Sequence, residues 1–308
     1  MGENITRREA LRKIYEALVV IGASAFISFE DLLAADNTVA EKPMVVWLHG
    51  TSCSGCSTAF LNIEDVPVVD LITKFVSLVF HPDLSSATGH QFIEILDQLT
   101  QSGKGYILVF EGGIPVKMPH TCMIADKPLT YWVERLAAKA TACIGAGTCA
   151  TLGGIASMDP VTGNIPLDRF LEQRNISKPI VNIPSCPMKP EHITYTILHL
   201  LKKGSLPELD KHFRPKKFFA RTIHERCLYY ADYQEGHFAE FIGDSGCLFK
   251  IGCQGPVTRN DCIIMGYNGN TNTCIKAGHP CIGCAGEKFP RQIMFHRFDD
   301  PRVIKNKF

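Results

Sequence analysis

The chain has 308 residues, of which 45% are hydrophobic and 20% are charged, and its formal net charge is +1. These proportions are ordinary for a globular protein with a hydrophobic core. The near-neutral charge excludes a general electrostatic attraction to nucleic acid or to acidic membranes, so we expect no nucleic-acid partner.

The first 35 residues have the pattern of an export signal. Arg7 and Arg8 form a twin arginine, and an apolar run follows at residues 18–29. That run is shorter than the roughly 20 apolar residues that a transmembrane helix needs. A charged segment before a short apolar one is typical of a cleaved signal, although an amphipathic surface helix is an alternative. We therefore predict a twin-arginine signal over residues 1–35 and export to the periplasm or to the outer face of the cytoplasmic membrane. We also predict a mature chain without a transmembrane anchor.

Short apolar runs alternate with longer helical patterns from residue 42 to residue 205. Strands are expected at residues 44–48, 76–80, 106–110, 142–146 and 180–183, and helices at 67–74, 89–101 and 129–140. Strands that alternate with helices predict a parallel sheet with helices on both faces. The sequence therefore predicts a doubly wound α/β domain over residues 42–205.

The composition changes after about residue 205. The remaining segment is rich in glycine, cysteine, asparagine and proline and has few periodic apolar runs. Such a segment buries too little apolar surface to offset its chain entropy, so it needs additional crosslinks. We expect a loop-rich, cofactor-bound domain over residues 206–308.

Cysteine is unusually frequent in this chain. There are 13 cysteines, and seven of them lie between Cys227 and Cys284. An odd number argues against a framework made only of disulfides, and long α/β-like chains rarely need so many of them. Ligation of a cofactor is the favoured interpretation.

Four cysteines follow the ends of predicted strands. Cys53 and Cys56 form a Cys-x-x-Cys pair after the first strand, Cys149 follows the fourth, and Cys186 follows the fifth. Ligands bind at the carboxyl edge of such sheets, so we expect the four thiols to converge. Four thiolates suit a 4Fe–4S cluster or zinc, and nearby glycines such as Gly147 favour the bulkier cluster. A redox dithiol and buried core thiols are the alternatives.

The C-terminal segment contains eight further candidate ligands, enough for two four-ligand sites. His224 and Cys227 are three residues apart and belong to one site, which Cys247 and Cys253 complete most simply. The other site is then made of Cys262, Cys274, Cys281 and Cys284. Zinc is an alternative occupant because mixed histidine–cysteine sets suit it, and His224 taken alone would be an ordinary surface histidine.

Three other residues are candidates for a structural or functional role. Cys143 lies inside the fourth predicted strand, and we expect a small buried hydrophobe there. Cys122 lies in a predicted loop, and we expect a buried thiol that is not a ligand. Glu111 ends the third strand beside the predicted crevice. A solvated carboxylate and a role in proton transfer or at a subunit interface are both open for it.

Several segments together resemble the small subunit of nickel–iron hydrogenases. They are Trp47-Leu48-His49-Gly50, Cys53-Ser54-Gly55-Cys56, Gly147-Thr148-Cys149-Ala150 with Gly153-Gly154, Pro184-Ser185-Cys186-Pro187, Ile223-His224-Glu225-Arg226-Cys227, Lys250-Ile251-Gly252-Cys253-Gln254-Gly255-Pro256-Val257-Thr258 and Ala277-Gly278-His279-Pro280-Cys281-Ile282-Gly283-Cys284. The resemblance covers nearly the whole chain. It implies a flavodoxin-like N-terminal domain, a loosely structured C-terminal iron–sulfur domain, and a partner large subunit that carries the nickel–iron site of the reaction H₂ ⇌ 2H⁺ + 2e⁻.

The resemblance also implies three iron–sulfur clusters that carry electrons to an external acceptor, for which a cytochrome is one candidate. The implied ligands are Cys53, Cys56, Cys149 and Cys186 for a proximal 4Fe–4S cluster, His224, Cys227, Cys247 and Cys253 for a distal 4Fe–4S cluster, and Cys262, Cys281 and Cys284 for a medial cluster.

The sequence departs from the common family pattern at three places. Cys274 stands where most members have proline. A thiolate there can hold a fourth iron, as in the nickel–iron–selenium members, so we expect a medial 4Fe–4S cluster in place of 3Fe–4S. Gly55 and Gly154 occupy positions where oxygen-tolerant members carry two extra cysteines, so we expect ordinary oxygen sensitivity at the proximal cluster. Ser52 replaces a glutamate that often precedes the first ligand.

Two rival functions are consistent with the cysteine pattern alone. One is an interaction protein stabilised by zinc, and the other is a free-standing electron carrier with several clusters and no hydrogenase partner.

Overall fold

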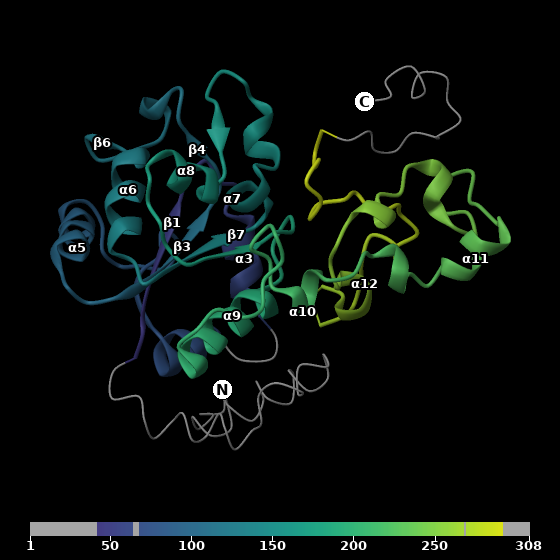
Figure 1. Ribbon diagram of the computed structural model, residues 1–308, viewed down its shortest axis with the longest axis horizontal. Coiled ribbons are helices and arrows are strands. Elements are labelled where there is room, and N and C mark those ends of the chain that lie inside the picture. Colours follow the sequence, from purple (N-terminus) through teal and green to yellow (C-terminus); the bar gives the residue numbers. More distant parts are fainter. Residues whose placement is uncertain (1–41, 64–67, 268, 292–308) are drawn as a thin grey trace.

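The structure is a computed structural model that describes residues 42–63, 68–267 and 269–291. A sheet-containing domain, coloured purple to teal, lies beside a loop-rich region, coloured green to yellow (Figure 1). The predicted export signal at residues 1–35 lies outside the described residues. Within the described residues, no helix combines the length and the apolar character needed to cross a bilayer.

The first domain is built on a five-stranded parallel sheet with the strand order β2-β1-β3-β7-β9. The strands are β1 (Met44–His49), β2 (Ser77–Phe80), β3 (Tyr106–Glu111), β7 (Ala142–Ala146) and β9 (Ile180–Ile183). All five predicted strands are present, and their order is the flavodoxin-like order of a doubly wound sheet. The predicted fold class is confirmed.

Helices cover both faces of the sheet, and each face has its own hydrophobic core. One core includes α5 (His90–Gln101), α6 (Leu129–Lys139) and α8 (Leu167–Gln173), and the other includes α3 (Gly55–Leu61), η1 (Leu71–Phe75) and α9 (Pro190–Lys203). In α6 the buried residues Leu129, Trp132, Val133 and Leu136 recur at the spacing of one helix face. Burying a side chain of this kind stabilises the fold by about 1.5–3 kcal/mol.

Two of the three predicted helices are found close to their predicted bounds, as α5 and α6. The third helix, predicted at residues 67–74, is split in the structure. The short helix α4 (Val68–Asp70) is followed directly by η1, which is a π-helix. The remaining elements of this domain are the strand pairs β4 (Ile114–Pro115) with β8 (Asn164–Ile165) and β5 (Met123–Ile124) with β6 (Lys127–Pro128), together with η2 (Pro119–Thr121), α7 (Thr148–Leu152) and η3 (Ile155–Met158).

The region beyond residue 205 contains only short helices among its described residues. They are α10 (Lys216–Phe219), η4 (His224–Arg226), α11 (Tyr230–Glu235), η5 (Leu248–Ile251), η6 (Gly255–Val257) and α12 (Cys262–Met265). Phe218 and Phe219 still pack in the core beneath α9. Further along, the buried residues that the structure describes form two small clusters, so apolar burial contributes little to holding this part together. The boundary at residue 205 stays a prediction.

The register of the sheet aligns the carboxyl ends of four strands. His49 of β1 pairs with Glu111 of β3, Glu111 pairs with Ala146 of β7, and Ala146 pairs with Ile183 of β9. The loops that leave these strands therefore begin side by side at one edge of the sheet, where open α/β sheets bind their ligands.

Candidate functional site

Four thiols meet at this edge of the sheet. Cys53 lies in the loop after β1, Cys56 lies in the first turn of α3, Cys149 lies in α7, and Cys186 lies in the loop after β9. Together they line a cavity of about 100 Å³. Cys56 is buried, whereas Cys53 is exposed. The predicted convergence of these four cysteines is therefore present in the structure.

Gly147 allows this close approach. Its backbone has φ +83° and ψ 167°, a region that only glycine adopts readily. A Cβ atom at this position would lie 2.3 Å from the Cys56 sulfur. Any other residue would have to push the two cysteine loops apart.

Glu111 fixes the first cysteine loop to the sheet. Its carboxylate accepts hydrogen bonds from the Cys56 amide at 3.1 Å, the Ser57 amide at 3.0 Å and the Ser52 hydroxyl at 2.8 Å. Burial by itself would raise the pKa of Glu111, but hydrogen bonds from His49, Ser57 and Ser52 outweigh it and hold the pKa at about 2. Because Glu111 is only 2% exposed, the interpretation as a solvated carboxylate is wrong. The hydrogen-bond donors of the cysteine loop take the place of water around the Glu111 carboxylate.

A second group forms in the loop-rich region. His224, Cys227, Cys247 and Cys253 line one small cavity. Burial lowers the pKa of His224, with Glu225 acting in the opposite direction, so the imidazole is neutral and has a nitrogen lone pair to offer. The Tyr229 amide donates to the Cys227 sulfur at 3.4 Å.

A third group lies between the other two. Burial is the largest cause that raises the pKa of Cys262, and the charges of Cys284 and Cys274 raise it further. Burial also raises the pKa of Cys281, and the charges of Cys284 and Cys262 act in the same direction. The four thiols are therefore close enough to influence one another, and exposed Cys274 is among them. The Gly283 amide donates to the Cys281 sulfur at 3.4 Å.

Two contacts join the three groups end to end. The backbone amide of Cys186, in the first group, donates to the sulfur of Cys284, in the third. The amide of Cys281, in the third group, donates to the sulfur of Cys253, in the second, at 3.4 Å. The third group is thus the middle one, although it comes last in the sequence.

The thiols of the three groups are spaced more widely than the ligands of a single zinc ion. A tetrahedral zinc ion with Zn–S bonds of about 2.3 Å holds its sulfurs about 3.8 Å apart. Among the described residues, His49, His81 and Asp83 place three candidate ligand atoms within 4.8 Å of one another. No three cysteine sulfurs in the described part of the chain lie that close together. All 13 cysteines are free thiols. Wider sets of thiols that remain unpaired fit a larger, multinuclear metal cofactor.

The two remaining cysteines lie apart from these groups. Cys143 is fully buried inside β7, as predicted. Cys122 is half-buried and packs against the core of the α5–α6 face. Burial raises the pKa of both thiols, to about 12 for Cys143, which makes them unreactive.

Comparisons with known proteins agree with this geometry. Residues 219–296 match the C-terminal family model of the NiFe/NiFeSe hydrogenase small subunit, and residues 53–200 match that of the NADH ubiquinone oxidoreductase 20 kDa subunit. The chain is 34% identical over 295 residues to the uptake hydrogenase small subunit of Azotobacter vinelandii, an alignment that covers 93% of this chain and 81% of the relative. It is 32% identical to the hydrogenase-2 small chain of Escherichia coli K12, with 95% and 78% covered.

Solved structures give the same result. A chain of the oxidised [NiFeSe] hydrogenase from Desulfovibrio vulgaris Hildenborough superposes with a TM-score of 0.79 at 33% identity, covering 84% of this chain and 99% of that one. A chain of the reduced Ni-Fe-Se hydrogenase from Desulfomicrobium baculatum gives 0.78 at 31% identity, with 83% and 100% covered. The chain belongs to the nickel–iron hydrogenase small-subunit family. It is the electron-transfer subunit of a heterodimeric hydrogenase, whose active site is on the large subunit.

Exposed apolar residues follow the first group of thiols along the chain in this hydrogenase small subunit. Cys53 is exposed, and Ile155, Met158 and Val161, which follow the Cys149 helix α7, are 58%, 48% and 63% exposed. Exposed apolar side chains that gather beside a site are typical of a subunit interface. We define Ile155, Met158 and Val161 as the apolar rim.

Sequence reasoning missed two residues beside these groups. His49 contacts the Glu111 carboxylate at 3.2 Å, and Lys189 is buried and donates to the Gly266 carbonyl oxygen at the end of the helix that begins at Cys262. His49 had a signal, because it follows the first strand at the predicted crevice. No local sequence pattern marks Lys189, because the residues that bury it, such as Gly266, are distant in the sequence.

Proposed function

We propose that this small subunit transfers electrons between the hydrogen-splitting site of the large subunit and an external acceptor through three iron–sulfur clusters. The observation that carries the proposal is the series of three four-ligand groups, each joined to the next by an amide-to-sulfur contact. Bound clusters supply one-electron redox steps, with potentials set by ligands, hydrogen bonds to sulfur and burial.

The proposed ligands follow the three groups. They are Cys53, Cys56, Cys149 and Cys186 for a proximal 4Fe–4S cluster, Cys262, Cys274, Cys281 and Cys284 for a medial 4Fe–4S cluster, and His224, Cys227, Cys247 and Cys253 for a distal 4Fe–4S cluster. The wide spacing of the thiols supports clusters over zinc.

The protein contributes charge and hydrogen bonds around these ligands. Burial raises the pKa of the Cys262, Cys281 and Cys284 thiols, to about 12 for Cys284. The thiolate form therefore depends on positive charge from bound iron. Amides that donate to Cys56, Cys227 and Cys281 stabilise that negative charge on sulfur. Neutral His224 in place of a thiolate makes the distal site less negative, which favours passage of an electron to an acceptor outside.

We propose in addition that the chain is exported by the twin-arginine route and works in the periplasm or at the outer face of the cytoplasmic membrane. The Arg7–Arg8 pair and the relatives named uptake hydrogenase small subunits support this proposal. Replacing both arginines by lysine should leave the hydrogenase in the cytoplasm, as cell fractionation would detect. Periplasmic activity of that variant would contradict it.

Purification of the native heterodimer under anaerobic conditions tests the electron-transfer proposal. We expect brown protein with iron for three clusters, and reduction of all three by H₂ in electron paramagnetic resonance (EPR) spectra. Zinc in place of iron, or fewer than three clusters in fully loaded protein, would overturn it.

A further inference from the structure

Lys189 is a buried cation that bridges the two parts of the chain. It directly precedes α9 and is 1% exposed. Its ammonium donates to the carbonyl oxygen of Gly266, lies 5.2 Å from the centre of the Tyr267 ring and lies 3.8 Å from a carboxylate oxygen of Glu191. A carbonyl, an aromatic face and a carboxylate replace the water that a lysine ammonium normally binds.

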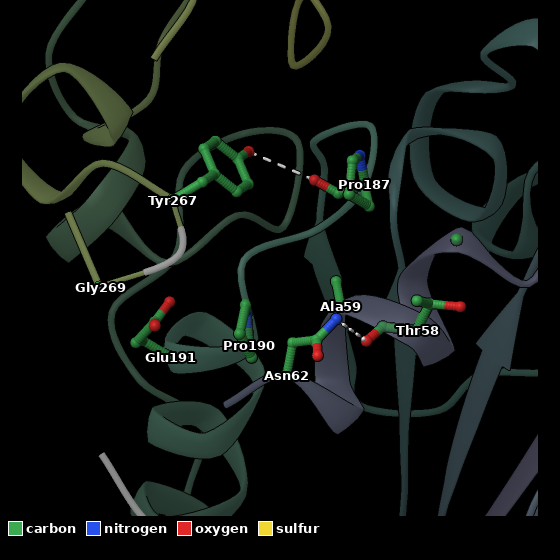
Figure 2. Close-up of a pocket in the computed structure, with 9 residues that line it drawn as sticks. Thr58, Ala59, Asn62, Pro187, Pro190, Glu191, Tyr267 and Gly269 are labelled. Atoms are coloured by element: carbon green, nitrogen blue, oxygen red, sulfur yellow. Dashed lines mark hydrogen bonds between the residues drawn. The ribbon is translucent and has the colours of Figure 1, made fainter. Parts of the chain in front are cut away.

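The charge of this ammonium is only partly compensated. Glu191 lines a pocket of about 330 Å³ together with Tyr267 and Pro187, and its side chain is 21% exposed, so water screens its carboxylate (Figure 2). The other nearby carboxylate, Asp261, also interacts with the Lys189 charge, but its main partner is the His192 ring nitrogen at 2.9 Å. Because Lys189 is buried and its counter-charge is solvated, the positive charge acts on the protein interior around it.

The third group of thiols lies in that interior. Gly266, which accepts the hydrogen bond from Lys189, ends the short helix α12 that begins at Cys262. The Gly266 amide returns a hydrogen bond of 2.8 Å to the Cys262 carbonyl oxygen. Two successive hydrogen bonds at Gly266 therefore link the Lys189 ammonium to Cys262, and a positive charge at this short range favours negative charge nearby. Lys189 therefore favours negative charge at Cys262.

We propose that Lys189 raises the reduction potential of the medial site by holding a positive charge beside the ligand Cys262. This inference rests on the proposed function, in which Cys262, Cys274, Cys281 and Cys284 hold the medial cluster. Reduction adds one electron there without forming or breaking a bond, and a nearby positive charge stabilises the more negative form. Lys189 thereby offsets the lowering of potential that the fourth thiolate, Cys274, introduces.

The test compares Lys189→Met with Lys189→Arg in the intact heterodimer. Each cluster's potential is measured by redox titration followed by EPR. In Lys189→Met the equilibrium constant for reduction of the medial cluster should fall about tenfold, which is about 59 mV for one electron. Lys189→Arg keeps the charge and should stay near wild type. The distal cluster is the internal reference and should not move.

Glu191→Gln provides a test of opposite sign. Removing the carboxylate leaves the ammonium less compensated, so the medial potential should rise. If Lys189→Met fails to bind iron, Lys189→Gln decides, because its amide can still donate to the Gly266 carbonyl oxygen without the charge: a lower medial potential supports the role of Lys189, and an unchanged or higher one overturns it. In iron-loaded Lys189→Met, an unmoved medial potential, or an equal shift at all three clusters, also overturns it.

The failure of this inference is distinguishable from failure of the proposed function. Wild-type heterodimer without an iron–sulfur signal from the medial site would contradict the proposed function itself. Wild type with three clusters, whose medial potential does not respond to Lys189→Met, would contradict only the role of Lys189.

Discussion

At the scale of single residues, buried charges hold the candidate sites in place. Glu111 accepts hydrogen bonds from both amides at the start of α3 and from the Ser52 and Ser57 hydroxyls. A carboxylate with this many donors stays ionised although it is buried. Ser52, which stands where relatives often have glutamate, is thus one of the groups that satisfy Glu111.

Glu111→Gln should weaken the first cysteine loop. The amide accepts fewer hydrogen bonds and carries no charge, and hydrogen bonds to charged groups are each worth about 1.5–3 kcal/mol. We expect a lower melting temperature of the anaerobic heterodimer and loss of iron from the proximal site. Glu134→Gln is the control, because Glu134 is exposed and its contact with Arg174 is 3.5 Å long. Wild-type stability and iron content in Glu111→Gln would rule out the anchoring role.

In the proposed function, Cys274 determines the type of the medial cluster. A proline at this position offers no ligand for a fourth iron, so Cys274→Pro should convert a 4Fe–4S cluster into 3Fe–4S. The measurement is EPR of the oxidised, anaerobically prepared protein, in which the variant should show a strong 3Fe–4S signal. Cys122→Ala removes a thiol outside the three groups and should leave the spectrum unchanged. A strong 3Fe–4S signal already present in fresh wild type would show that Cys274 is no ligand.

At the scale of elements, the turns after the strands determine which thiols meet. β7 runs into α7 through Gly147, and α7 carries Cys149 directly afterwards. Gly154 follows with φ +48°, and a Cβ atom at this position would lie 3.0 Å from the Cys149 amide nitrogen. A cysteine in place of Gly154 would therefore be strained in this chain. The oxygen sensitivity itself stays a prediction.

Gly147→Ala should abolish binding of the proximal cluster. The backbone conformation costs a non-glycine residue about 1–3 kcal/mol, and the new methyl group would overlap the Cys56 sulfur. Iron analysis should show loss of about one cluster per heterodimer. Gly103→Ala is the matched control, since a Cβ at Gly103 meets nothing within 4 Å. If Gly147→Ala retained all its iron, the close approach would not be essential.

At the scale of the whole molecule, the exposed proximal thiol requires a cover. Cys53 and the apolar rim lie on the side of the sheet where the strands end. The small subunit pairs with a large one that carries the active site, and in the proposed function an electron passes from that subunit into the proximal site. We propose that the large subunit lies over this face.

Ile155→Asp combined with Met158→Asp should therefore prevent assembly. Two carboxylates would have to lose their water in an apolar interface, which is strongly unfavourable. Co-purification with a tagged large subunit should fall at least tenfold. Val69→Asp is the control, because Val69 is 61% exposed but lies in α4, before β2, at the other edge of the sheet. Normal assembly of the double variant would place the interface elsewhere.

The sequence by itself indicated the strands and which cysteines come close together, whereas their role as ligands stays a prediction. Buried parallel strands are short apolar runs, and ligands such as His224 and Cys227 lie a few residues apart, so both features are local. Cys53, Cys149 and Cys186 are distant in sequence, but each follows a strand, and parallel strands end at one edge.

Only the tertiary structure decided which charges are buried and in what order the sites lie. Glu111 and Lys189 look like ordinary exposed residues in the sequence, because the groups that bury them come from other segments: Ser52 and Cys56 for Glu111, and Gly266 for Lys189. The chain order of the cysteines likewise puts the medial group last. Contacts from Cys186 to Cys284 and from Cys281 to Cys253 place it in the middle. These contacts join residues that lie far apart along the chain, so no local pattern encodes them, and they form only when the loop-rich region packs against the carboxyl edge of the sheet.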